Sequence, residues 1–198
     1  MEWSFKQLSD WRAATGSVNR LKETNVKHAQ KIKAKWVTPD AGCLKLNVDA
    51  NIVPGSSSFA IGMILRDHSG QYLRGKVMKF EREVYVFEAE MVGIEDALSW
   101  ILVKTEGKVC IESDSLLALA VQAVNEGSSN QFEIGHTIQA CRLTLAARSN
   151  VSVQHVRRLA NRAAYLMERI PYELNSYIDV MSPPCNVLES MMYDVLST

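Results

Sequence analysis

The chain has 198 residues, of which 47% are hydrophobic and 22% charged, so it can form one domain with a real core and has an ordinary globular composition. Its 22 Lys and Arg balance its 22 Asp and Glu, and the zero net charge gives no global indication of a polyanionic partner. No apolar stretch approaches the roughly 20 residues that a membrane-spanning helix needs, so we expect no membrane association.

Residues 1–35 are predicted to form a weakly patterned helical extension or linker. Residues 1–36 carry eight basic and three acidic side chains, a net charge of +5. A basic arm of this kind can contact nucleic acid, although such a segment is more often a solvated helix face or a linker. The sequence leaves both roles open.

The cysteine pattern indicates a reduced, intracellular protein of the cytoplasm or nucleus. The four cysteines form no C-x-x-C pair, and their spacing matches no zinc-ligand pattern. Cys110 and Cys141 fall inside predicted secondary structure, as small core residues do. The first residues lack the apolar core of a secretory signal.

A turn-rich boundary at 36–42 precedes three predicted strands. Residues 43–51 alternate, with Leu44, Leu46 and Val48 on one face. A break rich in proline, glycine and serine leads to a second strand at 59–65, and a hairpin turn at 66–70 leads to a third at 71–80. Three consecutive strands joined by short turns predict an antiparallel meander.

The hydrophobic period then changes from strand-like to helical. Residues 86–103 repeat apolar side chains at three- and four-residue spacing, which predicts an amphipathic helix. The remaining elements are a strand at 108–113, helices at 115–125 and 132–147, a strand at 151–156, a short helix at 161–169, an irregular stretch at 171–182 and a helix at 184–196. Strands that return through helices should lie parallel to the first strand. The predicted fold class is therefore α/β, with a five-stranded mixed sheet of three antiparallel and two parallel strands flanked by helices.

Three carboxylates fall where this topology can bring them together. Asp49 ends the first strand pattern, Asp114 ends the fourth, and Glu90 lies near the start of the first long helix. Ligands gather at the carboxyl ends of parallel strands, and carboxylates that meet there can hold two divalent cations for phosphodiester cleavage. Each acid alone has an ordinary alternative as a turn residue, a helix cap or a solvent-facing charge, so the prediction depends on their joint placement. Glu88 and Glu112 are competitors for the same role.

Several motifs occur in a fixed order along residues 36–196. They are Trp36 with Pro39, Lys45-Leu46-Asn47-Val48-Asp49, the run 61–67 followed by Gly70, Ala89-Glu90, Glu112-Ser113-Asp114-Ser115, His155-Val156-Arg157-Arg158, Asn161-Arg162-Ala163-Ala164, and Pro183-Pro184 before the terminal helix. Their combination resembles a ribonuclease H-type domain, in particular the plant branch derived from non-LTR retrotransposon reverse transcriptases. We expect this domain to span residues 36–170, with residues 171–198 as a C-terminal extension.

The resemblance implies hydrolysis of the RNA strand of an RNA–DNA hybrid with two Mg²⁺ ions. In it, Asp49 would bridge both ions, and Glu90 and Asp114 would hold the ion nearer the leaving group. Ribonuclease H folds contact the hybrid backbone in its minor groove. The candidates for such contacts are Asn51, Arg66, Asn161 and Arg162, although Arg66 and Asn161 match family positions that can also brace turns and helix starts.

One expected ligand is absent. The family has Asp where this chain has Tyr165, and a phenol, which is neutral near pH 7, is a poor ligand for magnesium. Glu168 follows three residues later on the same helical face and is an alternative, although its side chain starts nearly one turn away. The sequence favours loss of this ligand.

Three hypotheses follow for the activity. The first is an active or weakly active hybrid nuclease, supported by Asp49, Glu90 and Asp114. The second is a catalytically inactive domain that still binds nucleic acid, supported by Tyr165 and the neutral overall charge. The third is a protein-interaction module with no role in nucleic-acid binding, which retained affinity for a hybrid at moderate salt would exclude.

Overall fold

The computed structural model describes residues 35–52, 55, 57–104, 107–115, 133–171 and 176–196. Two predicted elements lie almost entirely outside these residues. They are the basic extension at 1–35, of which only Lys35 is described, and the helix at 115–125, of which only Ser115 is described.

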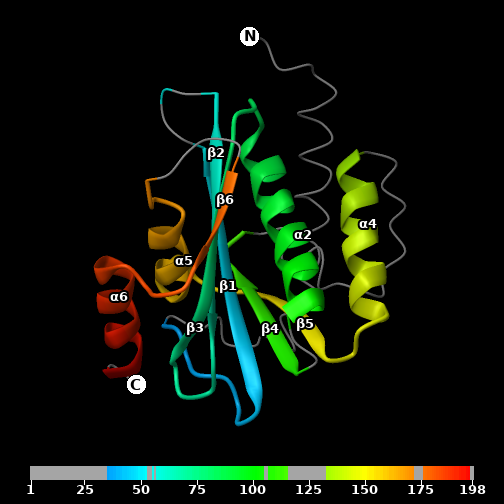
Figure 1. The fold of residues 1–198 in the computed structure, drawn as a ribbon. Helices are drawn as coiled ribbons and strands as arrows, with labels where there is room; N and C mark the ends of the chain where they lie inside the picture. Colours follow the sequence, from blue (N-terminus) through cyan, green and yellow to red (C-terminus); the bar gives the residue numbers. More distant parts are fainter. Residues whose placement is uncertain are drawn as a thin grey trace.

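A mixed sheet forms the centre of the molecule (Figure 1). Its first three strands, β1 (Cys43–Ile52), β2 (Phe59–Arg66) and β3 (Tyr72–Phe80), form an antiparallel meander. β4 (Lys108–Ser113) lies parallel to β1, and β5 (Val151–His155) lies parallel to β4. These pairings confirm the predicted meander and the predicted parallel strands, and they place the carboxyl ends of β1 and β4 at the same edge.

Within the described residues the sheet has six strands, one more than the five predicted. The order across it is β5-β4-β1-β2-β3-β6, where β6 (Ser176–Val180) pairs antiparallel with β3. The sequence analysis placed this segment in an irregular stretch. β6 is a short edge strand with its three central side chains exposed, among them Tyr177 with 68% of its surface accessible, so it lacks the alternation that marks a half-buried strand.

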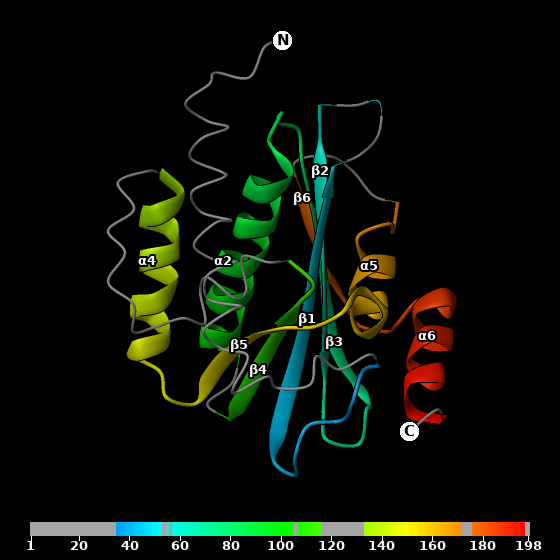
Figure 2. The same cartoon turned by 180° about the vertical axis from the view of Figure 1, so that it is seen from behind.

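Helices cover both faces of the sheet, as the two opposite views show (Figures 1 and 2). One face carries α2 (Val86–Lys104) and α4 (Glu133–Ala146). The other face carries a 3₁₀ turn, η2 (Arg158–Asn161), then α5 (Arg162–Met167) and α6 (Cys185–Leu196). The short helix predicted at 161–169 is therefore shorter, because its first residue belongs to η2 and it ends at Met167.

The two faces of β1 have different chemistry. Leu46, Val48 and Ala50 join the larger apolar core beneath α2 and α4. Lys45, Asn47 and Asp49 alternate with them and are also buried, so they point to the opposite face, towards α5 and α6. The face that carries α5 and α6 therefore contains the buried polar side chains of the central strand.

The turn between β2 and β3 forms as its sequence predicts. The Asp67 carboxylate accepts hydrogen bonds from the backbone N–H groups of Ser69 and Gln71 at 2.8 and 2.9 Å, and Gly70 adopts a φ of 78°. No described helix has the length and apolar character needed to cross a bilayer. None of the four cysteines, all of which are described, forms a disulfide.

Candidate metal centre

Asp49 lies near the carboxyl end of β1, with only 5% of its surface exposed. Its Oδ1 accepts a hydrogen bond from the backbone N–H of Ala50 at 3.1 Å. Burial raises the pKa of Asp49 to about 9, and the negative charges of Asp114, Glu168 and Glu90 add to this shift. A carboxyl group in this setting holds a proton at neutral pH unless a cation compensates its charge.

Asp114 follows the last residue of β4 and is held by two side chains. Its Oδ1 accepts a hydrogen bond from Asn161 Nδ2 at 2.8 Å, and its Oδ2 accepts one from Arg158 Nε at 3.0 Å. The side chain of Arg158 is 79% exposed, whereas that of Asp114 is 8% exposed. Arg158 therefore places a positive charge at the solvent side of the carboxylates, a role that the sequence analysis did not assign.

Glu90 reaches the same place from α2. Burial raises the pKa of Glu90 to about 8, with further contributions from the charges of Asp114 and Glu168. Asp49, Glu90 and Asp114, which lie in three different elements, therefore share one electrostatic neighbourhood. The structure brings together the three carboxylates that the sequence analysis singled out.

Glu168 is a fourth carboxylate in this neighbourhood. It immediately follows α5, and only 2% of its surface is exposed. Among the described residues, neither of its carboxyl oxygens has a hydrogen-bond partner, and Arg169 Nε lies 3.7 Å from Oε1. Burial raises the pKa of Glu168 to about 7, the charge of Asp114 also raises it, and the charges of Arg169 and Arg158 lower it.

Tyr165, at the position where the resemblance led us to expect an aspartate, is half-buried. The guanidinium of Arg169 lies over its ring, with the Cζ atom 4.4 Å from the ring centroid. This contact gives the aromatic ring a structural partner next to Glu168.

The structure separates the two competing glutamates from the site. Glu112 is 1% exposed, and its carboxylate binds Lys45 Nζ at 2.7 Å, Gln154 Nε2 at 2.7 Å and Asn47 Nδ2 at 3.0 Å. Glu88 accepts a hydrogen bond from the backbone N–H of Tyr85 at 2.7 Å, just before α2. Both carboxylates are occupied by structural contacts.

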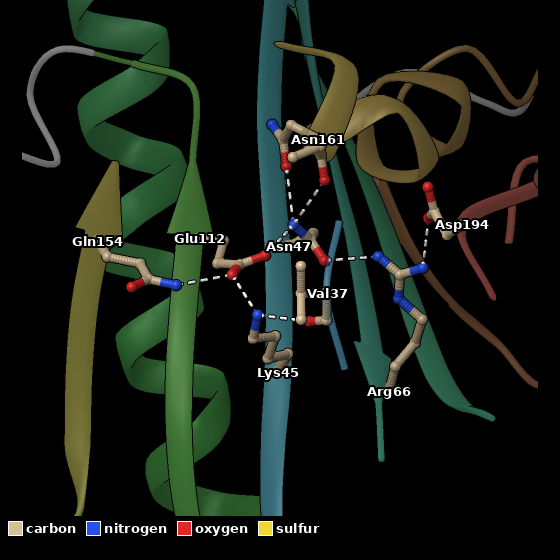
Figure 3. A network of polar contacts seen from close by, with 9 residues as sticks. Val37, Lys45, Asn47, Arg66, Glu112, Gln154, Asn161 and Asp194 are labelled. Atoms are coloured by element: carbon tan, nitrogen blue, oxygen red, sulfur yellow. Dashed lines mark hydrogen bonds and ion pairs between the residues drawn. The ribbon is translucent and has the colours of Figure 1, made fainter. Parts of the chain in front are cut away.

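A buried polar network lies next to the carboxylates and joins β1, β2, β4 and α6 (Figure 3). Asn47 stands at its centre, donating to Glu112 and to Asn161 Oδ1 at 3.2 Å and accepting from Arg66 Nη2 at 2.9 Å. Arg66 Nη1 also pairs with Asp194 Oδ2 at 2.7 Å. The network fixes the side chains around Asn161, which in turn hold Asp114.

This network corrects part of the predicted nucleic-acid interface. Arg66 is fully buried and its guanidinium stacks on Trp36, with Cζ 3.5 Å from the ring centroid, so it has no access to a nucleic-acid backbone. Asn161 is 1% exposed, and its amide group donates hydrogen bonds to Asp114 and to the carbonyl of Val48. Arg162 is exposed and Asn51 is half-buried, so these two stay candidates for such contacts.

The four carboxylates fit a hard divalent cation such as Mg²⁺ or Mn²⁺ in their chemistry, because all their donors are oxygen. Two observations support this fit. A cation would offset the burial and the mutual repulsion that raise the pKa of Asp49 and Glu90, and it would give the buried Glu168 oxygens a partner. Within the described part of the chain, no three His, Cys, Asp or Glu side chains are grouped closely enough to form a complete metal cluster as they lie. To bind an ion together, these carboxylates would therefore have to move closer to one another.

Comparisons with known proteins agree with this architecture. A family model described as reverse transcriptase-like matches residues 47–167. No curated protein sequence matches the chain significantly. A ribonuclease H1 isolated from compost by a metagenomic approach aligns with a TM-score of 0.55 and 17% identity, covering 64% of this chain and 92% of that one.

Two further solved structures have the same fold. Ribonuclease H1 from the halophilic archaeon Halobacterium salinarum aligns with a TM-score of 0.50 and 16% identity over 64% of this chain and 94% of that one. A type 1 ribonuclease H with the type 2 active-site motif has a TM-score of 0.50 and 13% identity, over 77% and 86% of the two chains. At these identities the likeness establishes the fold alone. Because the family match covers more than half of its residues, the chain belongs to the reverse transcriptase-like family and has a ribonuclease H-like fold.

Proposed function

We propose that this domain binds RNA–DNA hybrids and hydrolyses their RNA strand with the help of divalent metal ions. The observation that carries the proposal is the convergence of the carboxylates Asp49, Glu90 and Asp114 at the carboxyl ends of β1 and β4 and at the start of α2. The ribonuclease H-like fold supports the choice of substrate class. Mg²⁺, if held by these carboxylates, would supply activation of the attacking water and stabilisation of the departing oxygen.

The residues of this chain have distinct tasks in the proposal. The charges of Asp114, Glu168 and Glu90 all act on Asp49, which would provide the central pair of oxygen ligands. Asn161 and Arg158 hold the two oxygens of Asp114 in place. The exposed side chains of Arg158 and Arg162 provide positive charge for the phosphate backbone, which adds salt-sensitive affinity without reading sequence.

The chain's origin and cellular location are further proposals. The ordered motifs between Trp36 and the terminal helix support descent from a plant non-LTR retrotransposon reverse transcriptase. The cysteine pattern supports an intracellular location, in the cytoplasm or nucleus.

A cleavage assay on an end-labelled RNA–DNA hybrid tests the activity. With Mg²⁺ or Mn²⁺ we expect the wild-type chain to cut the RNA strand, and Asp49→Asn to lower the rate by about 100-fold or more because the central ligand loses its charge. Asp40→Asn is the matched control, since Asp40 is exposed at the opposite end of β1. Equal rates for Asp49→Asn and wild type would contradict the proposal.

Binding without cleavage is the second candidate function, and Tyr165 is the observation that favours it. In that case the wild-type chain would bind the hybrid in a salt-sensitive way without cutting it. Activity that appears only in Tyr165→Asp would then identify a site inactivated at one ligand. Absence of hybrid binding at moderate salt would instead favour a protein-interaction module.

A further inference from the structure

Glu168 is the most buried carboxylate of the candidate metal centre, and no described residue explains its burial. Its side chain is 1% exposed, and within the described residues both of its carboxyl oxygens lack a hydrogen-bond partner. The nearest cation, Arg169 Nε, is 3.7 Å from Oε1, longer than a charge-assisted hydrogen bond. Burial of a carboxylate is costly unless it is paired and hydrogen-bonded. A bound cation would supply the partner that this side chain lacks among the described residues.

The backbone of Glu168 packs against Gly62, which is the partner of Asp49 in the sheet. In this antiparallel register the side chain of Asp49 and the position that a side chain would take at Gly62 point to the same face, about 5 Å apart. A Cβ atom on Gly62 would lie 2.9 Å from the Cα atom of Glu168 and 2.3 Å from its nitrogen. Only a glycine at position 62 lets the end of α5 approach the sheet this closely.

Glu168 is close enough to the other carboxylates to affect their pKa values. Its negative charge contributes to the raised pKa of both Asp49 and Glu90, and the charge of Asp114 acts on Glu168 in turn. Tyr165, one turn earlier, has its ring under the guanidinium of Arg169. Position 168 therefore supplies the negative charge that position 165 lacks.

We propose that Glu168 is the fourth carboxylate of the metal centre and takes the place of the ligand missing at Tyr165, so that the chain keeps a complete set of acidic ligands. This inference rests on the proposed function for the location of the site. Its own content is the assignment of Glu168, which sequence spacing had placed second to simple loss of the ligand. The ions that fit are Mg²⁺ and Mn²⁺, because every donor is a carboxylate oxygen.

Mn²⁺ titration calorimetry on the full chain tests the assignment without depending on cleavage. We expect Glu168→Gln to weaken Mn²⁺ affinity by about tenfold or more, since loss even of an outer partner of a metal ligand typically costs 10- to 100-fold. Glu189→Gln, on the exposed surface of α6, is the matched control and should bind as wild type does. Tyr165→Phe should also leave the affinity unchanged.

A second variant and a second measurement guard against a change in folding. The double variant Tyr165→Asp with Glu168→Gln should regain most of the Mn²⁺ affinity, because one carboxylate from α5 is restored. In EDTA the melting temperature of Glu168→Gln should be at least that of wild type, because a buried unpaired acid is removed. Mn²⁺ should raise the melting temperature of this variant less than it raises that of wild type.

The outcomes separate this inference from the proposed function. Unchanged Mn²⁺ affinity in Glu168→Gln, or no Mn²⁺ binding by wild type, overturns the assignment. Mn²⁺ binding that depends on Glu168 without hybrid cleavage keeps the assignment and rejects the nuclease. Cleavage that Asp49→Asn abolishes and Glu168→Gln leaves unchanged keeps the nuclease and rejects Glu168 as a ligand.

Discussion

Asn161 links the buried network to the candidate site through a single amide group. Its two amide hydrogens go to Asp114 Oδ1 at 2.8 Å and to the Val48 carbonyl at 2.9 Å. Its carbonyl oxygen accepts from Asn47 Nδ2 at 3.2 Å. Three hydrogen bonds fix its orientation, so Asn161 is a positioning residue for Asp114.

Replacement of this amide should affect both stability and metal binding. We expect Asn161→Ala to lower the free energy of unfolding by about 1–3 kcal/mol, because buried partners lose their hydrogen bonds. It should also weaken Mn²⁺ binding, since Asp114 is less constrained. Urea unfolding and calorimetry measure the two effects. Arg162→Ala, at the exposed neighbouring position, should stay within about 0.5 kcal/mol of wild type, and equal stability of the two variants would refute the role of Asn161.

Individual residues also show where a sequence stops being informative. Arg66 was a candidate for nucleic-acid contact because of the resemblance to ribonuclease H folds, yet its partner Asp194 lies 128 residues further along the chain. No local pattern marks such a pair. Glu168 was weighed only by its spacing from Tyr165, and its importance became visible from the approach of α5 to Gly62.

At the scale of elements, strong periodicity was sufficient for most of the fold. The alternation in 43–51 and the helical spacing in 86–103 predicted β1 and α2 to within one residue at either end. β6 was missed because an edge strand has little of its surface buried, and its position depends on pairing with β3. Elements whose place is set by distant partners are the ones that sequence pattern could not supply.

The terminal helix α6 is attached to the sheet by a buried ion pair. Asp194→Ala would leave the Arg66 guanidinium buried without its carboxylate, so we expect the free energy of unfolding to fall by about 3–5 kcal/mol. Asp96→Ala is the control, because Asp96 is 30% exposed and 3.7 Å from Lys76, and it should change stability by about 1 kcal/mol or less. Urea unfolding compares them, and similar losses would show that burial of the pair is unimportant.

The contact between α5 and β2 depends on the absence of a side chain at Gly62. An alanine methyl group would meet the backbone nitrogen of Glu168 and the carbonyl of Ala164 at 2.3 and 2.6 Å, and neither can rotate away. We expect Gly62→Ala to cost about 1–3 kcal/mol of stability and to weaken Mn²⁺ binding, because α5 is displaced.

Gly93→Ala provides the comparison for this variant. Its nearest neighbour would be Val48 Cγ2 at 3.4 Å, so it should be neutral or stabilising by up to about 1 kcal/mol in a helix. Unfolding curves and Mn²⁺ titrations of both variants check the difference. A Gly62→Ala protein with wild-type stability and metal affinity would show that the close approach is dispensable.

For the whole molecule, zero net charge conceals a strongly uneven distribution. The face of the sheet under α2 and α4 is apolar, whereas the face under α5 and α6 holds buried acids and bases. The bases Lys45 and Arg66 are matched by Glu112 and Asp194. In the described part of the chain, Arg158 and Arg169 are the bases paired with the carboxylates of the candidate metal centre, so two positive charges face four acids that can ionise.

This imbalance predicts how stability depends on pH and metal. The pKa values of Asp49, Glu90 and Glu168 are raised to about 9, 8 and 7. At pH values between the ordinary pKa of about 4 and these raised values, the folded protein therefore binds more protons than the unfolded chain. Without metal, stability should therefore be greatest at the acidic end of this window and fall as the pH rises from about 5 to 8. Mn²⁺ should reduce this slope, because it binds the deprotonated carboxylates of the folded state.

Urea unfolding at several pH values, in EDTA and in Mn²⁺ at matched ionic strength, measures the slope of stability against pH. Asp49→Asn should flatten it in EDTA, since the most strongly shifted group is removed and the remaining acids repel less. Stability that rises with pH across this window in EDTA would mean that these acids are already compensated within the protein, and the case for a metal at this edge of the sheet would lose its electrostatic basis.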